Sequence, residues 1–131
     1  MHSFGANLHF FWDRAKALAP GKYYKRAFVG GNADLNFQWH SYGAGEAEIK
    51  IWSTNLSERR DVSDSTPATA PAVWVDESPY GATFLTVPTG TPGSDRLDVA
   101  VPGWANILVE LTVTVELEEF SLTVRGQTRA G

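Results

Sequence analysis

The sequence predicts an all-β fold, an antiparallel β-sandwich or jelly roll of seven to eight strands with an N-terminal arm or short helix. The main observation is the stretch from Ile107 to Leu117, where every odd position is a large aliphatic residue and the even positions are mostly Glu or Thr. Successive strand residues point to opposite faces, so this strand has one apolar and one polar side. Phe120, Leu122 and Val124 repeat the pattern directly afterwards. Two such strands in a row predict an antiparallel layer, whose apolar face needs a second layer to cover it.

The earlier strands are shorter and are separated by Gly, Pro and Asn. Leu35 to Trp39 and Ala47 to Ile51 both alternate apolar and polar residues, and the glycine-containing segment Tyr42 to Gly45 joins them. This order predicts a β-hairpin, with His40 on the polar side of the first strand. Further strands are predicted at Val73 to Val75, Thr83 to Val87 and Leu97 to Val101.

The N-terminal segment allows two interpretations. Apolar residues recur from Leu8 to Leu18 at intervals of three and four, which predicts a short helix capped by Asn7 and stopped by Pro20-Gly21. Alternatively, Leu8 to Trp12 is an extended arm, because four of its five residues are aromatic or His. In either case residues 1–30 are expected to form a basic aromatic arm and residues 31–131 the sandwich domain, although Tyr23 to Val29 is also compatible with a first strand.

Composition and charge narrow the class of protein. The 131 residues suit one domain, and the absence of cysteine removes disulfides and thiolate metal sites. No apolar run approaches the length of a membrane span, so we expect a soluble protein without a membrane partner. Residues 1–30 contain five basic residues and one acidic residue, a net +4, whereas the remainder contains six and fourteen, a net −8. This asymmetry is either ordinary scatter or the mark of an arm that docks on an acidic surface.

The residues that carry catalytic chemistry are sparse. No nucleophile-elbow motif accompanies the three histidines, and the neighbouring carboxylates Asp76-Glu77 and Glu118-Glu119 diverge at strand ends. No segment follows a calcium-loop or phosphate-loop pattern, and the acidic body disfavours nucleic acid. We therefore expect a protein that is not an enzyme and has no cofactor, no metal site and no nucleic-acid partner.

The tryptophans and one long polar segment are the remaining candidates for function. Trp52 and Trp74, together with Tyr80, could form a platform that stacks against a sugar ring, with core packing as the alternative for each Trp. The stretch from Ser53 to Pro71 is rich in Ser, Thr, Asp, Arg and Pro and has no period. Such a long loop is a further candidate for function.

Five segments within about residues 33 to 127 form a recognisable order: Ala47-Glu48-Ile49-Lys50-Ile51-Trp52-Ser53, Trp74-Val75-Asp76, Arg96-Leu97-Asp98-Val99, Trp104 to Leu111, and Leu122-Thr123-Val124-Arg125-Gly126. In this order the chain resembles small β-sandwich virion proteins of tailed bacteriophages. The chain looks most like capsid decoration (cement) proteins and related head or tail accessory subunits. It departs from them in the long Ser53 to Pro71 loop and in Glu110, where Arg is commoner.

This resemblance implies a non-enzymatic structural subunit that binds the major capsid protein or another virion protein. It also implies a homo-oligomer, most often a trimer, located in the virion after assembly in the host cytoplasm. In this hypothesis the arm docks on the particle through three aromatic and four basic residues: Phe10, Phe11, Trp12, Arg14, Lys22, Lys25 and Arg26. The second hypothesis is a carbohydrate-binding β-sandwich module, which uses Trp52, Trp74 and Tyr80.

Overall fold

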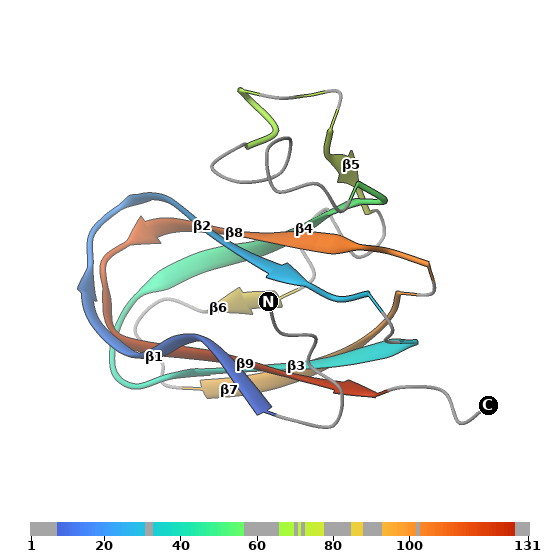
Figure 1. Ribbon diagram of the computed structural model, residues 1–131. Helices are drawn as coiled ribbons and strands as arrows, with labels where there is room; N and C mark the ends of the chain where they lie inside the picture. Colours follow the sequence, from blue (N-terminus) through green and yellow to red (C-terminus); the bar gives the residue numbers. More distant parts are fainter. Residues whose placement is uncertain are drawn as a thin grey trace.

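A computed structural model describes residues 8–30, 33–56, 66–69, 71, 73–77, 85–87, 93–101 and 103–127. Two antiparallel sheets pack face to face, which confirms the predicted sandwich (Figure 1). The four-stranded sheet has the order β1 (Leu8–Leu18), β9 (Leu117–Gln127), β3 (Asp34–Ser41) and β7 (Gly93–Ala100). The five-stranded sheet has the order β2 (Gly21–Phe28), β8 (Asn106–Val115), β4 (Glu46–Thr54) and β5 (Val75–Asp76), and β6 (Leu85–Val87) also pairs with β4. The described ranges thus contain nine strands, more than predicted, and no helix that could cross a membrane.

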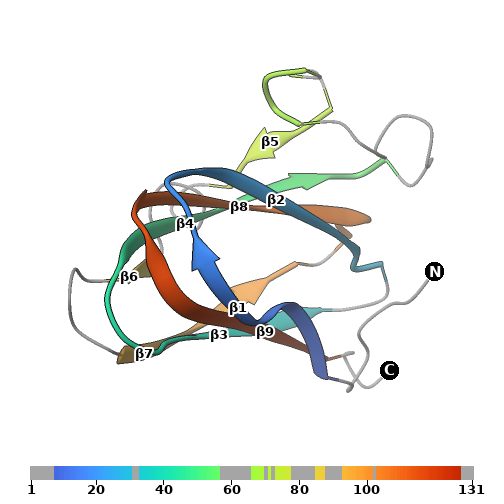
Figure 2. The ribbon, with the colours of Figure 1, turned by 90° about the vertical axis from the view of Figure 1, so that its left-hand side faces the viewer.

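The order of the strands is that of a jelly roll. β1 pairs with β9, β2 with β8, β3 with β7 and β4 with β6, so the antiparallel pairs are nested one inside another along the chain. The chain therefore crosses from one sheet to the other between β1 and β2 (Figure 2), and again at each later step except those from β4 to β5 and from β5 to β6. The predicted hairpin between β3 and β4 is wrong for this reason, and β8 and β9 do not form one layer either.

The turns that cross from one sheet to the other pack against each other. Between β3 and β4, Ala44 accepts a hydrogen bond at its carbonyl from the Glu118 amide over 3.0 Å, just after the crossing from β8 to β9. A Cβ on Gly45 would lie 2.5 Å from Leu117 Cδ2 and 2.8 Å from the Glu116 carbonyl oxygen. The close approach of the two turns, with φ +141° at Gly45, requires glycine at this position.

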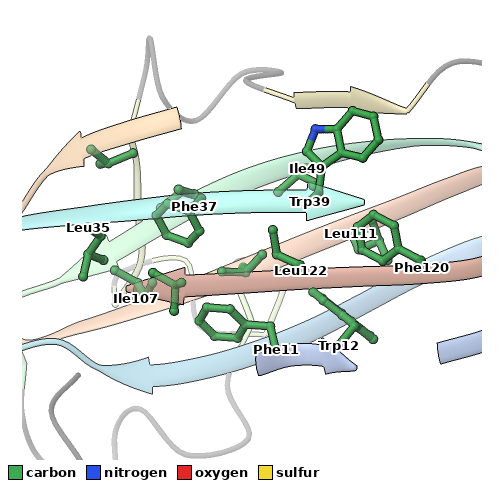
Figure 3. Packing of buried hydrophobic residues seen from close by; sticks show 14 of the residues in the cluster. Phe11, Trp12, Leu35, Phe37, Trp39, Ile49, Ile107, Leu111, Phe120 and Leu122 are labelled. Carbon is green, nitrogen blue, oxygen red and sulfur yellow. The ribbon is translucent and has the colours of Figure 1, made fainter. Parts of the chain in front are cut away.

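The core lies between the sheets and contains the residues that the alternation assigned to the apolar face. Large side chains from both layers meet there with almost no exposed surface (Figure 3); they include Leu35, Phe37, Trp39, Ile49, Ile107, Leu111, Phe120 and Leu122. The outward residues of β3, which include His40, are more exposed, as predicted.

Strand β1 replaces the predicted helix. Its register against β9 runs Phe10–Thr123, Trp12–Leu122 and Ala15–Phe120, so two β-bulge-like shifts each insert one extra residue. Arg14 lies close to the second shift and has a positive φ of 52°. Core-facing residues of a regular strand are two positions apart. The two extra residues increase this interval to three or four positions in β1, which is the interval expected for a helix. Phe11 and Trp12 are consequently both buried in the core.

Residues 8–28 therefore belong to the sandwich. They form β1 and β2, and each of these strands pairs along the C-terminal half of the chain, with β9 and β8 respectively. The predicted boundary after residue 30 is thus not a boundary between an arm and a domain in the described part of the chain. Residues 1–7 lie outside the described residues.

The described part of the segment after β4 folds back over the outer face of the five-stranded sheet. Trp74 is buried on Leu108, and Tyr24, Trp52 and Val73 surround this contact. β5 follows directly and pairs with the end of β4. Figure 1 shows β5 beside the end of β4. Most of the Ser53 to Pro71 stretch lies outside the described residues.

Candidate functional site

A groove of about 730 Å³ lies over the outer face of the four-stranded sheet. It is lined by polar and aromatic residues from all four strands and from the turn after β3, namely Phe10, Asp13 and Arg14 of β1, Asn36, Gln38, Trp39 and His40 of β3, Tyr42 of the turn, Arg96 of β7, and Ser121, Thr123 and Arg125 of β9. A concave surface with several converging polar groups is the usual form of a ligand site.

The alternation of β3 forms the floor of this groove. The odd residues from Leu35 to Trp39 are buried in the core, so Asn36 and Gln38 are on the outer face. The register places Asn36 between Asp98 of β7 and Arg125 of β9. Gln38 lies in the same way between Arg96 and Thr123, and His40 lies between Ser94 and Ser121. Three polar rows therefore cross the sheet side by side.

Hydrogen bonds hold two of these rows in place. Asn36 Nδ2 donates to Asp98 Oδ1 over 2.6 Å. Arg96 Nη2 donates to Gln38 Oε1 over 3.4 Å, and Thr123 Oγ1 donates to the carbonyl oxygen of Gln38 over 3.3 Å. These contacts use only part of the hydrogen-bonding capacity of the side-chain amides of Asn36 and Gln38. The floor therefore presents oriented donors and acceptors to a ligand.

Two exposed aromatic rings accompany the polar floor. Phe10 of β1 is 46% exposed and Tyr42 is 40% exposed, unlike the large core residues. The Tyr42 ring lies 4.2 Å from the His40 ring between centroids, and the Arg14 guanidinium carbon lies 5.4 Å from the Tyr42 centroid. These contacts fix the Tyr42 ring while leaving much of its surface open to solvent.

Arg14 is held mainly by Glu119. Its Nε donates to Glu119 Oε2 over 2.9 Å, and Lys16 Nζ lies 3.8 Å from the other carboxylate oxygen. The hydrogen bond to Glu119, followed by the charge of that carboxylate, raises the pKa of Arg14 above its ordinary value. Arg14 therefore remains charged and is already partnered at the border of the groove.

The residues of the predicted docking arm lie in several different environments. Phe10 and Arg14 reach the groove, whereas Phe11 and Trp12 are in the core, which corrects their assignment as partner-binding residues. The basic residues Lys22, Lys25 and Arg26 belong to β2, in the other sheet. Lys25 Nζ lies 5.8 Å from the centroid of the Trp12 ring. The described part of residues 1–30 therefore does not form one basic aromatic surface.

Lys22 is paired with Glu110 on the outer face of the five-stranded sheet. Its Nζ lies 3.0 Å from Glu110 Oε2, and this hydrogen bond is the largest cause of the raised pKa of Lys22. Because the pKa of Lys22 is higher in the folded than in the unfolded chain, the ion pair stabilises the fold fully at pH values below the unfolded pKa. This stabilisation is lost as the pH rises through the folded pKa. The ion pair is therefore intact at neutral pH. Glu110, where the resemblance favours Arg, is the buried partner in this pair.

The predicted sugar platform is not assembled as expected. Trp74 is only 4% exposed and packs on Leu108, which corrects its assignment as a stacking residue. Trp52 is half-buried: its Nε1 donates to Glu110 Oε1 over 3.3 Å, and Lys50 Nζ lies 4.6 Å from the ring centroid. Tyr80 lies outside the described residues. Trp52 and Trp74 thus attach the returning segment to the sheet.

The sequence did not predict most of the groove residues as site residues, although it placed several of them on the polar face of a strand. Asn36, Gln38 and Arg125 each occupy an ordinary outward position of a strand, and no motif joins them. The available signal was the set of planar polar side chains on three successive outward positions of β3. Among the described residues, no group of three or more His, Asp or Glu side chains could hold a metal ion.

Comparisons with known proteins concern the fold alone. No family model and no curated protein matches the chain. A structure of Bacillus endospore appendages, described as disulfide-linked pili, is similar at 15% identity over 93% of this chain and 88% of that chain, with a TM-score of 0.43. The K2 cleaved adhesin domain of Lys-gingipain is similar at 11% identity over 95% and 70%, with a TM-score of 0.44. The N-terminal CBM22-1–GH10 modules of Clostridium thermocellum xylanase 10B, complexed with xylohexaose, are similar at 10% identity over 99% of this chain and 30% of that chain, with a TM-score of 0.45.

Proposed function

We propose that this domain binds glycans through the groove on the outer face of its four-stranded sheet. The observation that supports this function is the combination of a floor of amide, guanidinium and hydroxyl groups with the exposed rings of Phe10 and Tyr42. The proposed carbohydrate-binding surface is therefore on the four-stranded sheet, and not at Trp52 and Trp74 on the five-stranded sheet.

The chemistry of this groove matches that of a sugar. Each hydroxyl of a saccharide both donates and accepts hydrogen bonds, and the side-chain amides of Asn36 and Gln38 do the same. The C–H faces of a sugar ring are apolar, so they stack against aromatic rings, which provide a large contact area at low entropic cost. The aromatic surface has to be exposed before binding, and among the described aromatic side chains Phe10 and Tyr42 meet this condition.

Substitutions in the groove should weaken binding and leave the fold intact. Tyr42→Ala removes a stacking surface and Gln38→Ala removes a row of hydrogen bonds. We expect each change to weaken binding about tenfold, the equivalent of about 1.4 kcal/mol. Affinity gel electrophoresis against a panel of soluble glycans measures this loss. Val75→Ala, which changes an exposed apolar residue of β5 in the other sheet, is the control and should bind normally. Full affinity of both groove variants would place the binding surface elsewhere.

A second proposal, supported by the resemblance of residues 33 to 127, is that the chain is an accessory subunit of a phage virion. In this proposal it binds the major capsid protein or another virion protein as a homotrimer, and the groove remains open on the particle surface. The arm-docking form of this hypothesis is not retained, because Phe11 and Trp12 are core residues and Lys22 is paired within the chain.

The oligomeric state tests this second proposal. Light scattering should give three times the 14.3 kDa mass of the chain, and the protein should cosediment with capsid shells. A monomer mass at high concentration, together with no cosedimentation, would contradict it.

A further inference from the structure

We infer that the groove prefers acidic polysaccharides, an inference that depends on the glycan-binding function proposed above. The cations that line the groove are all arginines, whereas all four lysines of the chain lie outside it. The guanidinium group is planar and can bind a carboxylate through two parallel hydrogen bonds, which an ammonium group cannot do. The choice of cation thus fits a ligand that carries carboxylates.

The charge of the groove contrasts with that of the whole chain. Its lining contains three arginines and one aspartate, which together with Glu119, the partner of Arg14, give a net +1 with His40 neutral; the chain carries −4, so the remaining residues carry −5. An acidic polymer is therefore repelled by most of the molecule and attracted to this one face. Neutral glycans gain nothing from this arrangement.

Arg96 and Arg125 line the groove on the two strands next to β3, whereas Arg14, which is paired with Glu119, lies at its border. They belong to β7 and β9, on either side of β3, and their registers differ by two residues. Strand spacing and rise place their Cα atoms on the order of 12 Å apart. Two guanidinium groups on separate strands can bind two carboxylates of the same ligand, so a chain with repeated carboxylates should bind more tightly than a monomer.

Two carboxylates border this pair of arginines. Asp13 lines the groove from β1, and Asp98 on β7 accepts the hydrogen bond from Asn36. Both repel an acidic ligand at the two edge strands of the sheet. The acidic groups of the polymer are therefore expected at Arg96 and Arg125, with its hydroxyls over Asn36 and Gln38.

Single-stranded nucleic acid is another polyanion, but the groove suits it less well. Tight binding to phosphate chains needs many cationic contacts, and this surface offers few on a chain of net negative charge. A single-stranded oligonucleotide is therefore included in the test below.

The decisive experiment compares ligands that differ only in charge. Affinity electrophoresis or calorimetry is carried out with polygalacturonate, its methyl ester, monomeric galacturonate, alginate, hyaluronate, a neutral galactan and a single-stranded oligonucleotide. We expect at least one acidic polymer to bind about tenfold more tightly than the neutral polymers, the methyl ester included, and the monomer to bind weakly. Raising the salt concentration from about 50 to about 300 mM should weaken the acidic complex.

Matched variants locate the effect. Arg96→Gln and Arg125→Gln should each reduce the affinity for the acidic polymer about tenfold and leave that for neutral polymers nearly unchanged. Arg26→Gln makes the same exchange in the other sheet and should have no effect. Equal binding of charged and neutral polymers, or tighter binding of the oligonucleotide, would overturn the preference. Neutral binding in the groove would leave the proposed function standing, whereas no binding of any glycan would overturn both.

Discussion

Deletion of residues 1 to 18 should leave a chain that does not fold. The deletion removes β1, with Phe11 and Trp12, from the core and leaves β9 as an unprotected edge strand. Loss of one large buried aromatic side chain costs about 3 to 5 kcal/mol, and a domain has only about 5 to 15 kcal/mol in total. Circular dichroism and size-exclusion chromatography of the refolded chain measure the outcome.

Point variants separate this effect from the length of the deletion. Phe11→Ala and Trp12→Ala should each lower the free energy of unfolding by about 3 to 5 kcal/mol. Phe10→Ala, at the exposed neighbour in the same strand, should cost less than about 1 kcal/mol. A truncated chain that stays folded with an unchanged thermal midpoint would show that residues 8–18 are a detachable arm.

Val113→Asp should unfold the domain. Val113 is 2% exposed on the core face of β8, and the charged carboxylate would have no partner among the aliphatic side chains around it. Burial of an unpaired charge places the expected cost above about 4 kcal/mol, at the extreme end of single substitutions. Urea unfolding followed by tryptophan fluorescence measures this change.

The same exchange two residues further along serves as the control. Val115 lies in the same strand but is 42% exposed, so Val115→Asp should cost less than about 1 kcal/mol. Equal stabilities of the two variants would mean that the core face of β8 has been assigned wrongly.

The sequence was informative about faces and poor about connections. Alternation separated buried from exposed positions correctly in β3, because a period of two has a direct physical cause. In β8 it assigned the odd positions up to Val113 to the core correctly, but Leu108 and Glu110 on the other face are buried as well. It could not show that β8 and β9 lie in different sheets, since a crossing turn and a hairpin turn leave the same pattern on either side. The packing of Gly45 against Leu117, which accompanies one such crossing, is a contact between distant residues.

Strand β1 shows how a local rule identified the correct face and the wrong element. The spacing of Phe11, Trp12 and Ala15 correctly identified residues that pack on the core. The spacing fits a helix only because two bulges add a residue each, and the bulges depend on the pairing with β9. Propensity within a short window contains no information about such a partner.

The groove could not be predicted for a related reason. Gln38, Arg96 and Thr123 form one row, yet they come from three strands that are far apart in the sequence. Each residue taken singly is an ordinary polar residue on the solvent side of a strand. Only the register of β3 against both neighbours brings them together.

The central claim, that glycans bind on the four-stranded sheet, is tested most directly by an amide NMR titration with the glycan that is retained best. We predict that the largest shift changes occur at Gln38, Tyr42 and Thr123, and that the indole signal of Trp52 stays in place. Shift changes confined to the five-stranded sheet, or to the loop from Ser53 to Pro71, would contradict the account.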